Sequence, residues 1–145
     1  MKTRYRKDSL KRFDSNYGEN KKMNSEVYKL RRKVMNIIYE VNGLIEGRFP
    51  RVQVRINDQG TGNKCRVLGT ATMGMNEIWI SDDAFKYDDR RLYHVVLHEL
   101  CHAMFSTDHS DNCHLMAPSI PRDLDNAKAL KAFKGYAKKA GYKLA

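Results

Sequence analysis

Long apolar segments are missing from this sequence, and cysteine is scarce. No apolar run approaches the roughly 20 residues that a membrane-spanning helix needs, and the basic N-terminus MKTRYRKDSLKRF lacks the apolar stretch of a signal peptide. The 3 cysteines are too few, and odd in number, for a disulfide framework. These absences predict a cytoplasmic protein with no membrane span and no disulfide scaffold.

The length and composition are those of one globular domain. The chain has 145 residues, of which 41% are hydrophobic and 30% are charged. A domain of this size can bury a stable core without disulfide bonds or a structural metal. We expect a basic flexible tail over residues 1–22 and a single monomeric domain over residues 23–145.

Positive charge is concentrated at the two flanks of the chain. Residues 1–33 hold 12 Lys and Arg against 4 acids, and residues 121–145 hold 7 against 2, whereas residues 34–120 hold 8 against 11. Two interpretations remain open: the flanks are solvated surfaces that aid solubility, or they bind polyanions weakly. No nucleic-acid-binding motif accompanies them.

Hydrophobic periodicity predicts an α+β fold with a small mixed or antiparallel sheet. Apolar residues recur at helical steps in three segments and alternate, as in strands, in three others. In chain order the predicted elements are a helix from Asn24 or Ser25 to Gly47, strands at 51–58, 64–73 and 77–81, a helix from Asp88 to about Phe105, a loop at 106–120 and a helix from Pro121 to about Ala140.

The second predicted helix carries the sequence His98-Glu99-Leu100-Cys101-His102, an H-E-x-x-H pattern. Residues four apart share one face of a helix, about 6 Å apart along the axis, so the His98 and His102 imidazoles can bind one ion. Glu99 lies about 100° around the helix, where its carboxylate can act as a general base on water. Zinc accepts imidazole nitrogens and keeps one position open for water in catalytic sites. His94 is about 12 Å along the axis from His102, so we interpret it as structural or as a support for the ligands.

A third metal ligand must come from outside this helix. One class of H-E-x-x-H enzymes uses a glutamate far downstream, and this class is excluded because no glutamate follows Glu99. The nearest remaining candidates are Asp108, His109, Asp111 and His114, with Asp123 and Asp125 further along the chain.

The segment HELCHAMFSTDHSDNCHLMAP, residues 98–118, resembles the metzincin superfamily of zinc peptidases, and its matrixin-like branch in particular. His98, Glu99 and His102 match the first part of that pattern, and the sequence around Met116 resembles its Met-turn. The resemblance implies a minimal metzincin-like fold, one catalytic Zn²⁺ and hydrolysis of peptide bonds. It also implies an upstream edge strand that holds extended substrate by main-chain pairing, with the residues Glu77, Ile78, Trp79 and Ile80.

Two departures from the family pattern concern the third ligand. The glycine that bends the family's chain after the motif helix is replaced by Phe105, and a histidine stands one residue late, at His109. Either a one-residue insertion delivers His109 to the metal, or Asp108 in the strict position is the ligand. We favour His109 because imidazole suits zinc. His114 is a more distant alternative.

The leading hypothesis is a zinc metalloendopeptidase that acts on polypeptide, with Glu99 as its general base. One alternative is a structural or binding module that holds zinc without turnover. Another is a zinc protease associated with nucleic acid, anchored by the basic flanks.

Overall fold

The computed structural model describes residues 21–46, 52–57, 69–71, 73–81 and 88–145. Most of the expected tail, residues 1–20, and the first part of the strand expected at 64–73, residues 64–68, lie outside the described residues. Residues 21 and 22 belong to the first helix. Within the described ranges, no helix is both long and apolar enough to cross a membrane.

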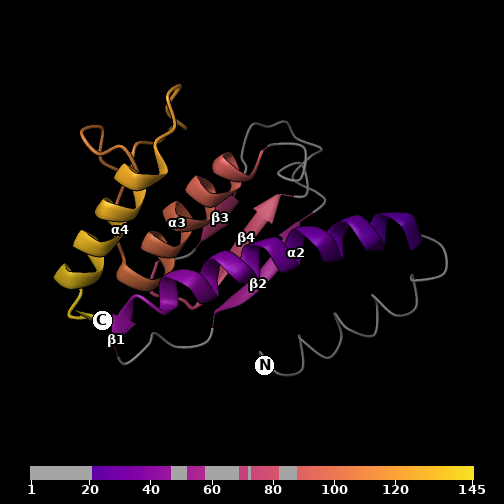
Figure 1. Ribbon diagram of the computed structural model, residues 1–145, viewed down its shortest axis with the longest axis horizontal. Coiled ribbons are helices and arrows are strands. Elements are labelled where there is room, and N and C mark those ends of the chain that lie inside the picture. Colours follow the sequence, from indigo (N-terminus) through magenta and orange to yellow (C-terminus); the bar gives the residue numbers. More distant parts are fainter. Residues whose placement is uncertain (1–20, 47–51, 58–68, 72, 82–87) are drawn as a thin grey trace.

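The fold is α+β, as the periodicity predicts, and in the described part of the chain four short strands lie between the first helix and the next two (Figure 1). The elements in chain order are α2 (Lys21–Asn42), β1 (Ile45–Glu46), β2 (Gln53–Asn57), β3 (Gly69–Ala71), β4 (Glu77–Ser81), α3 (Asp89–Phe105), α4 (Asn126–Lys139) and β5 (Lys143–Leu144).

Strands β2, β4 and β3 form a mixed sheet in that order. Strand β4 pairs in parallel with β2, Gln53 opposite Glu77, and antiparallel with β3, Thr70 opposite Trp79. The prediction that Glu77, Ile78, Trp79 and Ile80 form the edge strand is therefore wrong, because β4 has a partner on each side. Among the described strands of this sheet, β3 is the edge strand on the side of α3.

Helices α2 and α3 lie next to each other against the sheet, α2 on β2 and α3 on β3 and β4. Alternation along β4 turns Ile78 and Ile80 into the core that these helices cover, and both side chains are fully buried. The other face carries Trp79, with the Arg55 guanidinium 5.5 Å from its ring centroid. Helix α4 packs on α3.

The bounds of α2 differ from the prediction at both ends. The helix begins at Lys21, before the expected caps, and ends at Asn42, before Gly47. Beyond Asn42 the chain turns, and Ile45 joins β1, which pairs antiparallel with β5 through Ile45 opposite Leu144. Ile45 therefore belongs to a strand, although its apolar side chain at a helical step predicted that the helix would include it.

Aspartate side chains begin both later helices. The Asp88 carboxylate accepts a hydrogen bond from the Arg91 backbone N–H, and Asp125 accepts from the N–H groups of Ala127 and Lys128. The prediction that α4 starts at Pro121 is wrong, because the Asp125 cap defines the start at Asn126.

Candidate metal centre

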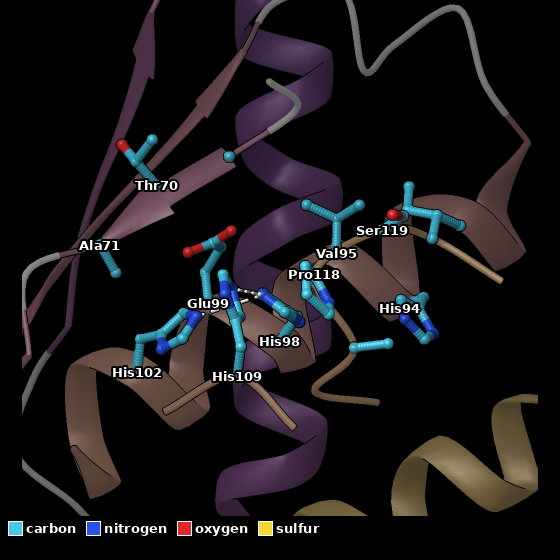
Figure 2. Close-up of a pocket in the computed structure, with 13 residues that line it drawn as sticks. Thr70, Ala71, His94, Val95, His98, Glu99, His102, His109, Pro118 and Ser119 are labelled. Carbon is cyan, nitrogen blue, oxygen red and sulfur yellow. Dashed lines mark hydrogen bonds between the residues drawn. The ribbon is translucent and has the colours of Figure 1, made fainter. Parts of the chain in front are cut away.

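Three histidines converge at the surface of α3 (Figure 2). His98 and His102 lie one turn apart on the helix, and their Nε2 atoms are 3.2 Å apart. The His109 Nε2 atom, from the loop after the helix, lies 3.3 Å from the His98 Nε2 atom. One ligand atom from each residue can be chosen so that all three lie within 4.8 Å of one another. Tetrahedral zinc with nitrogens at 2.0–2.1 Å has neighbouring nitrogens about 3.3 Å apart, so the spacing fits such an ion.

Backbone carbonyl groups set the orientation of the two helical imidazoles. The His98 Nδ1–H donates to the Leu115 carbonyl at 2.7 Å, and the His102 Nδ1–H donates to the Thr107 carbonyl at 2.6 Å. A neutral imidazole that donates from Nδ1 has its lone pair on Nε2. The Nε2 lone pairs of His98 and His102 therefore face each other at 3.2 Å, an arrangement that repels unless a cation lies between them. Histidines that bind metals are held in the same way, by a hydrogen bond from the ring nitrogen that does not face the ion.

Burial favours the neutral, ligand-competent form of both helical histidines. The pKa of His98 is lowered to about 4, mainly by burial. The hydrogen bond to Leu115 opposes this shift, and the charges of His102 and His109 lower the pKa further. Burial also lowers the pKa of His102. Both shifts favour the neutral ring, the form in which a nitrogen that faces the cluster can bind a cation.

The loop after α3 brings His109 to the other two histidines. Ser106 ends the helix in the left-handed conformation, with φ of 52°, and the backbone N–H of Ser106 donates to the Cys101 carbonyl. The bend therefore falls one residue after Phe105 and three residues before His109. The Phe105 ring lies 5.3 Å from the ring of Phe133 on α4, so this side chain joins two helices where the resemblance expects a glycine.

His109 completes the cluster, and the alternative third ligands do not. Asp108 is exposed. Among the described residues, the group that could hold a metal ion consists of three histidines and does not include Asp108. The His114 Nε2 atom accepts a hydrogen bond from the Asp125 backbone N–H at 3.1 Å. Its ring packs against His94 instead, with 5.5 Å between centroids. The structure therefore brings together the three histidines that the sequence analysis favoured.

Glu99 lies beside the cluster with its carboxylate under the edge strand. Figure 2 shows this side chain between the three imidazoles and β3. It is 6% exposed, and burial raises its pKa to about 8. A cation on the neighbouring imidazoles would favour its ionised form.

Gly69 on β3 lies close to this carboxylate. A Cβ at this position would lie 3.0 Å from Glu99 Cγ and 3.2 Å from Glu99 Oε2. Glycine therefore lets the strand approach the carboxylate without displacing it. This approach of Gly69 to Glu99 was not predicted from the sequence.

A cleft of about 650 Å³ runs past the cluster. One wall is β3, the floor is α3, and the other wall is the loop over 117–120 (Figure 2). Its lining residues are Gly69, Thr70, Ala71, His94, Val95, His98, Glu99, His102, His109, Ala117, Pro118, Ser119 and Ile120. The three histidines and Glu99 therefore face an open space that a ligand can enter.

The turn around Met116 supports the cluster from below the surface. Met116 is fully buried, and its carbonyl accepts a hydrogen bond from the Ser110 backbone N–H at 2.9 Å. Its own N–H donates to Cys113 Sγ at 3.4 Å. Because the preceding residue, Leu115, accepts from His98, the turn connects the hydrophobic core with the orientation of a ligand.

Comparisons with protein-family models, with curated proteins and with solved structures give no match. The function of the chain is therefore inferred from the geometry of its own site.

Proposed function

We propose that the protein is a zinc-dependent metallopeptidase, with His98, His102 and His109 as ligands and Glu99 as general base. The observation that carries the proposal is the pair of facing Nε2 atoms at 3.2 Å, both on rings whose Nδ1–H groups are held by carbonyls. A third imidazole at 3.3 Å leaves one tetrahedral position for water or substrate. Three nitrogen ligands with an open position are typical of catalytic zinc, whereas structural zinc has four protein ligands.

The remaining chemistry is assigned to residues of the chain. Zinc, when bound, polarises a carbonyl group and lowers the pKa of water beside it. Glu99 accepts the proton of the attacking water and returns it to the leaving amine. Gly69 keeps β3 close without displacing the carboxylate, so the base stays beside the ligands.

Strand β3 is the part of the cleft that suits a polypeptide substrate. Among the described residues it pairs only with β4, and its residues Gly69, Thr70 and Ala71 line the cleft. An extended peptide can add to such an edge through main-chain hydrogen bonds. This role replaces the one first expected for β4.

The test compares Glu99→Gln with Glu40→Gln, a neutralisation of an exposed carboxylate on α2. Both proteins are loaded with zinc, zinc content is measured by atomic absorption, and hydrolysis of fluorescein-labelled casein is followed. We expect one zinc per chain in both proteins. Loss of the base in Glu99→Gln lowers kcat by about 10²- to 10⁴-fold, and Glu40→Gln retains wild-type activity.

Two outcomes contradict the proposal. If Glu99→Gln cleaves as fast as wild type, Glu99 is not the base. If the wild-type protein binds one zinc ion but cleaves neither casein nor a broad peptide library, the site belongs to a non-catalytic zinc module.

A further inference from the structure

Helix α4 presents a row of lysines on the side opposite its buried face. The row consists of Lys128, Lys131, Lys134 and Lys138. At 100° per residue these four positions fall within about 120° of one another, and they span about 15 Å along the axis. The opposite side is fixed in the core by fully buried residues, Ala129, Phe133 and Ala137. The helix that carries the row is therefore anchored in the core, and of the four lysines Lys128, Lys131 and Lys138 are exposed whereas Lys134 is half-buried.

Among the described residues, no ion pair neutralises the charges of this lysine row. Residues 126–145 contain 6 lysines and no acidic residue. The acid immediately before them, Asp125, accepts hydrogen bonds from backbone N–H groups at the start of α4. Neither of the ion pairs found among the described residues involves the row.

The basic residues of α2 differ from the row because some of them have partners. Lys33 forms an ion pair with Asp89 at 3.1 Å, and the Arg31 guanidinium donates to the Val54 carbonyl at 2.9 Å. These two side chains contribute to the packing of α2, whereas none of the ion pairs within the described part of the chain involves the row on α4.

Small residues separate the lysines on the outward face. Ala127 and Gly135 lie in the same sector of the helix, and both are exposed. A Cβ at Gly135 would meet nothing within 4 Å, so packing within the protein does not require glycine there. Glycine is unfavourable inside a helix, and its presence lets a partner approach the backbone between Lys131 and Lys138.

We propose that the lysine row is a sequence-independent binding surface for the phosphate backbone of nucleic acid. Lysine contacts phosphates as a point charge, and such contacts position a nucleic acid without reading its bases. A protein partner fits the surface less well, because lysine is depleted in protein interfaces and the row contains no aromatic or arginine anchor. A membrane also fits less well, since the apolar side of α4 is buried and cannot insert among lipids.

The proposal is tested on the full chain with a fluorescein-labelled 20-base-pair DNA duplex of mixed sequence. Binding is measured by fluorescence anisotropy between 50 and 200 mM salt, conditions chosen because phosphate contacts are salt-dependent. The variant Lys131→Gln/Lys138→Gln removes two charges from the row. The matched control, Lys29→Gln/Arg32→Gln, removes two exposed charges from α2. Lysine, arginine and glutamine have similar helix propensities, so both folds are retained.

Each lost phosphate contact reduces the slope of log K against log salt by about 0.9. We therefore expect the row variant to reduce the slope by about 1.8 and to bind about 10- to 100-fold more weakly near 100 mM salt. The α2 control has a smaller effect on both quantities. Gly135→Leu keeps the net charge and fills open space, and it weakens binding several-fold if the duplex contacts the row directly.

Three results overturn the proposal. In the first, the full chain does not bind the duplex. In the second, the row variant and the α2 control weaken binding equally, which would assign the effect to net charge. In the third, the row variant loses binding to phosphatidylserine–phosphatidylcholine vesicles but keeps its affinity for DNA, which would identify the row as a membrane surface. The measurement needs no zinc and no hydrolysis, so its outcome is independent of the proposed peptidase activity.

Discussion

Helices α2 and α3 both pack against the three-stranded sheet, but they bury different kinds of side chain. The buried side chains of α2 are apolar, namely Leu30, Val34, Ile38 and Val41. Helix α3 buries ten of its 17 residues, and these include His94, Glu99 and His102. Burial of polar groups lowers stability unless they are fully partnered. The comparison indicates that α2 contributes apolar packing, whereas α3 also buries polar side chains beside the histidine cluster.

The largest effect is expected when His109, the candidate ligand from outside α3, is removed. His109→Ala removes the third imidazole, and we expect zinc affinity to fall by more than about 100-fold because even supporting residues of metal sites contribute 10- to 100-fold. His114→Ala, which changes a neighbouring loop histidine, retains one zinc per chain. Equilibrium dialysis with zinc measures both. Equal loss in the two variants would mean that the loop as a whole, rather than His109, determines binding.

The next effect compares one buried leucine from each helix. Leu30 on α2 and Leu97 on α3 are almost completely buried, and replacement of either by alanine lowers the free energy of unfolding by about 2–5 kcal/mol. Only Leu97→Ala also lowers kcat, because Leu97 precedes His98 and its cavity loosens the ligand-bearing turn. Urea unfolding and casein hydrolysis at a temperature where both variants are folded give the two quantities. An equal loss of kcat in Leu30→Ala would show that α2 is more than a scaffold.

The smallest effect concerns His94, the buried histidine of α3 outside the cluster. Its side chain is 2% exposed, its Nδ1 has no hydrogen-bond partner, and burial, followed by the charges of His114 and His98, lowers its pKa to about 4. Between pH 6.5 and pH 4 the unfolded chain therefore binds a proton that the folded chain does not. Stability is present above pH 6.5 and falls as the pH falls.

For this one group, the loss between pH 7.5 and pH 5 is about 2 kcal/mol. His94→Gln, measured by urea unfolding of zinc-free protein at both pH values, should show a pH dependence smaller than wild type by that amount. An unchanged pH dependence would show that His94 is protonated to the same extent in both states.

Local sequence patterns predicted the elements that depend on local interactions. The alternation over 77–81 coincides with β4, and the helix that carries His98, Glu99 and His102 begins after Asp88 as expected. Spacing on one helix is fixed by its geometry, which is why the two helical ligands could be assigned. His109 was favoured from imidazole chemistry, and the structure brings it to the cluster.

Features that depend on distant partners could not be predicted in the same way. The position of β4 between β2 and β3 depends on pairing, and alternation alone does not reveal which strand lies at the edge. The short strand β1 was assigned to a helix because Ile45 is apolar at a helical step, and only its pairing with Leu144 makes it a strand. The left-handed conformation of Ser106 was also missed, since serine seldom adopts it without tertiary support.

The pairing of β1 with β5 has a consequence for the order in which the molecule folds. Strand β1 follows α2 and strand β5 follows α4, with the three-stranded sheet, α3 and α4 between them in the sequence. Contacts at such separation require closure of a long loop, so they form after the local ones. We therefore expect the cleft to assemble first and the two-stranded pair to close last. Opening of that pair would then be an early step of unfolding, one that releases the end of α4 while the histidine cluster is still intact.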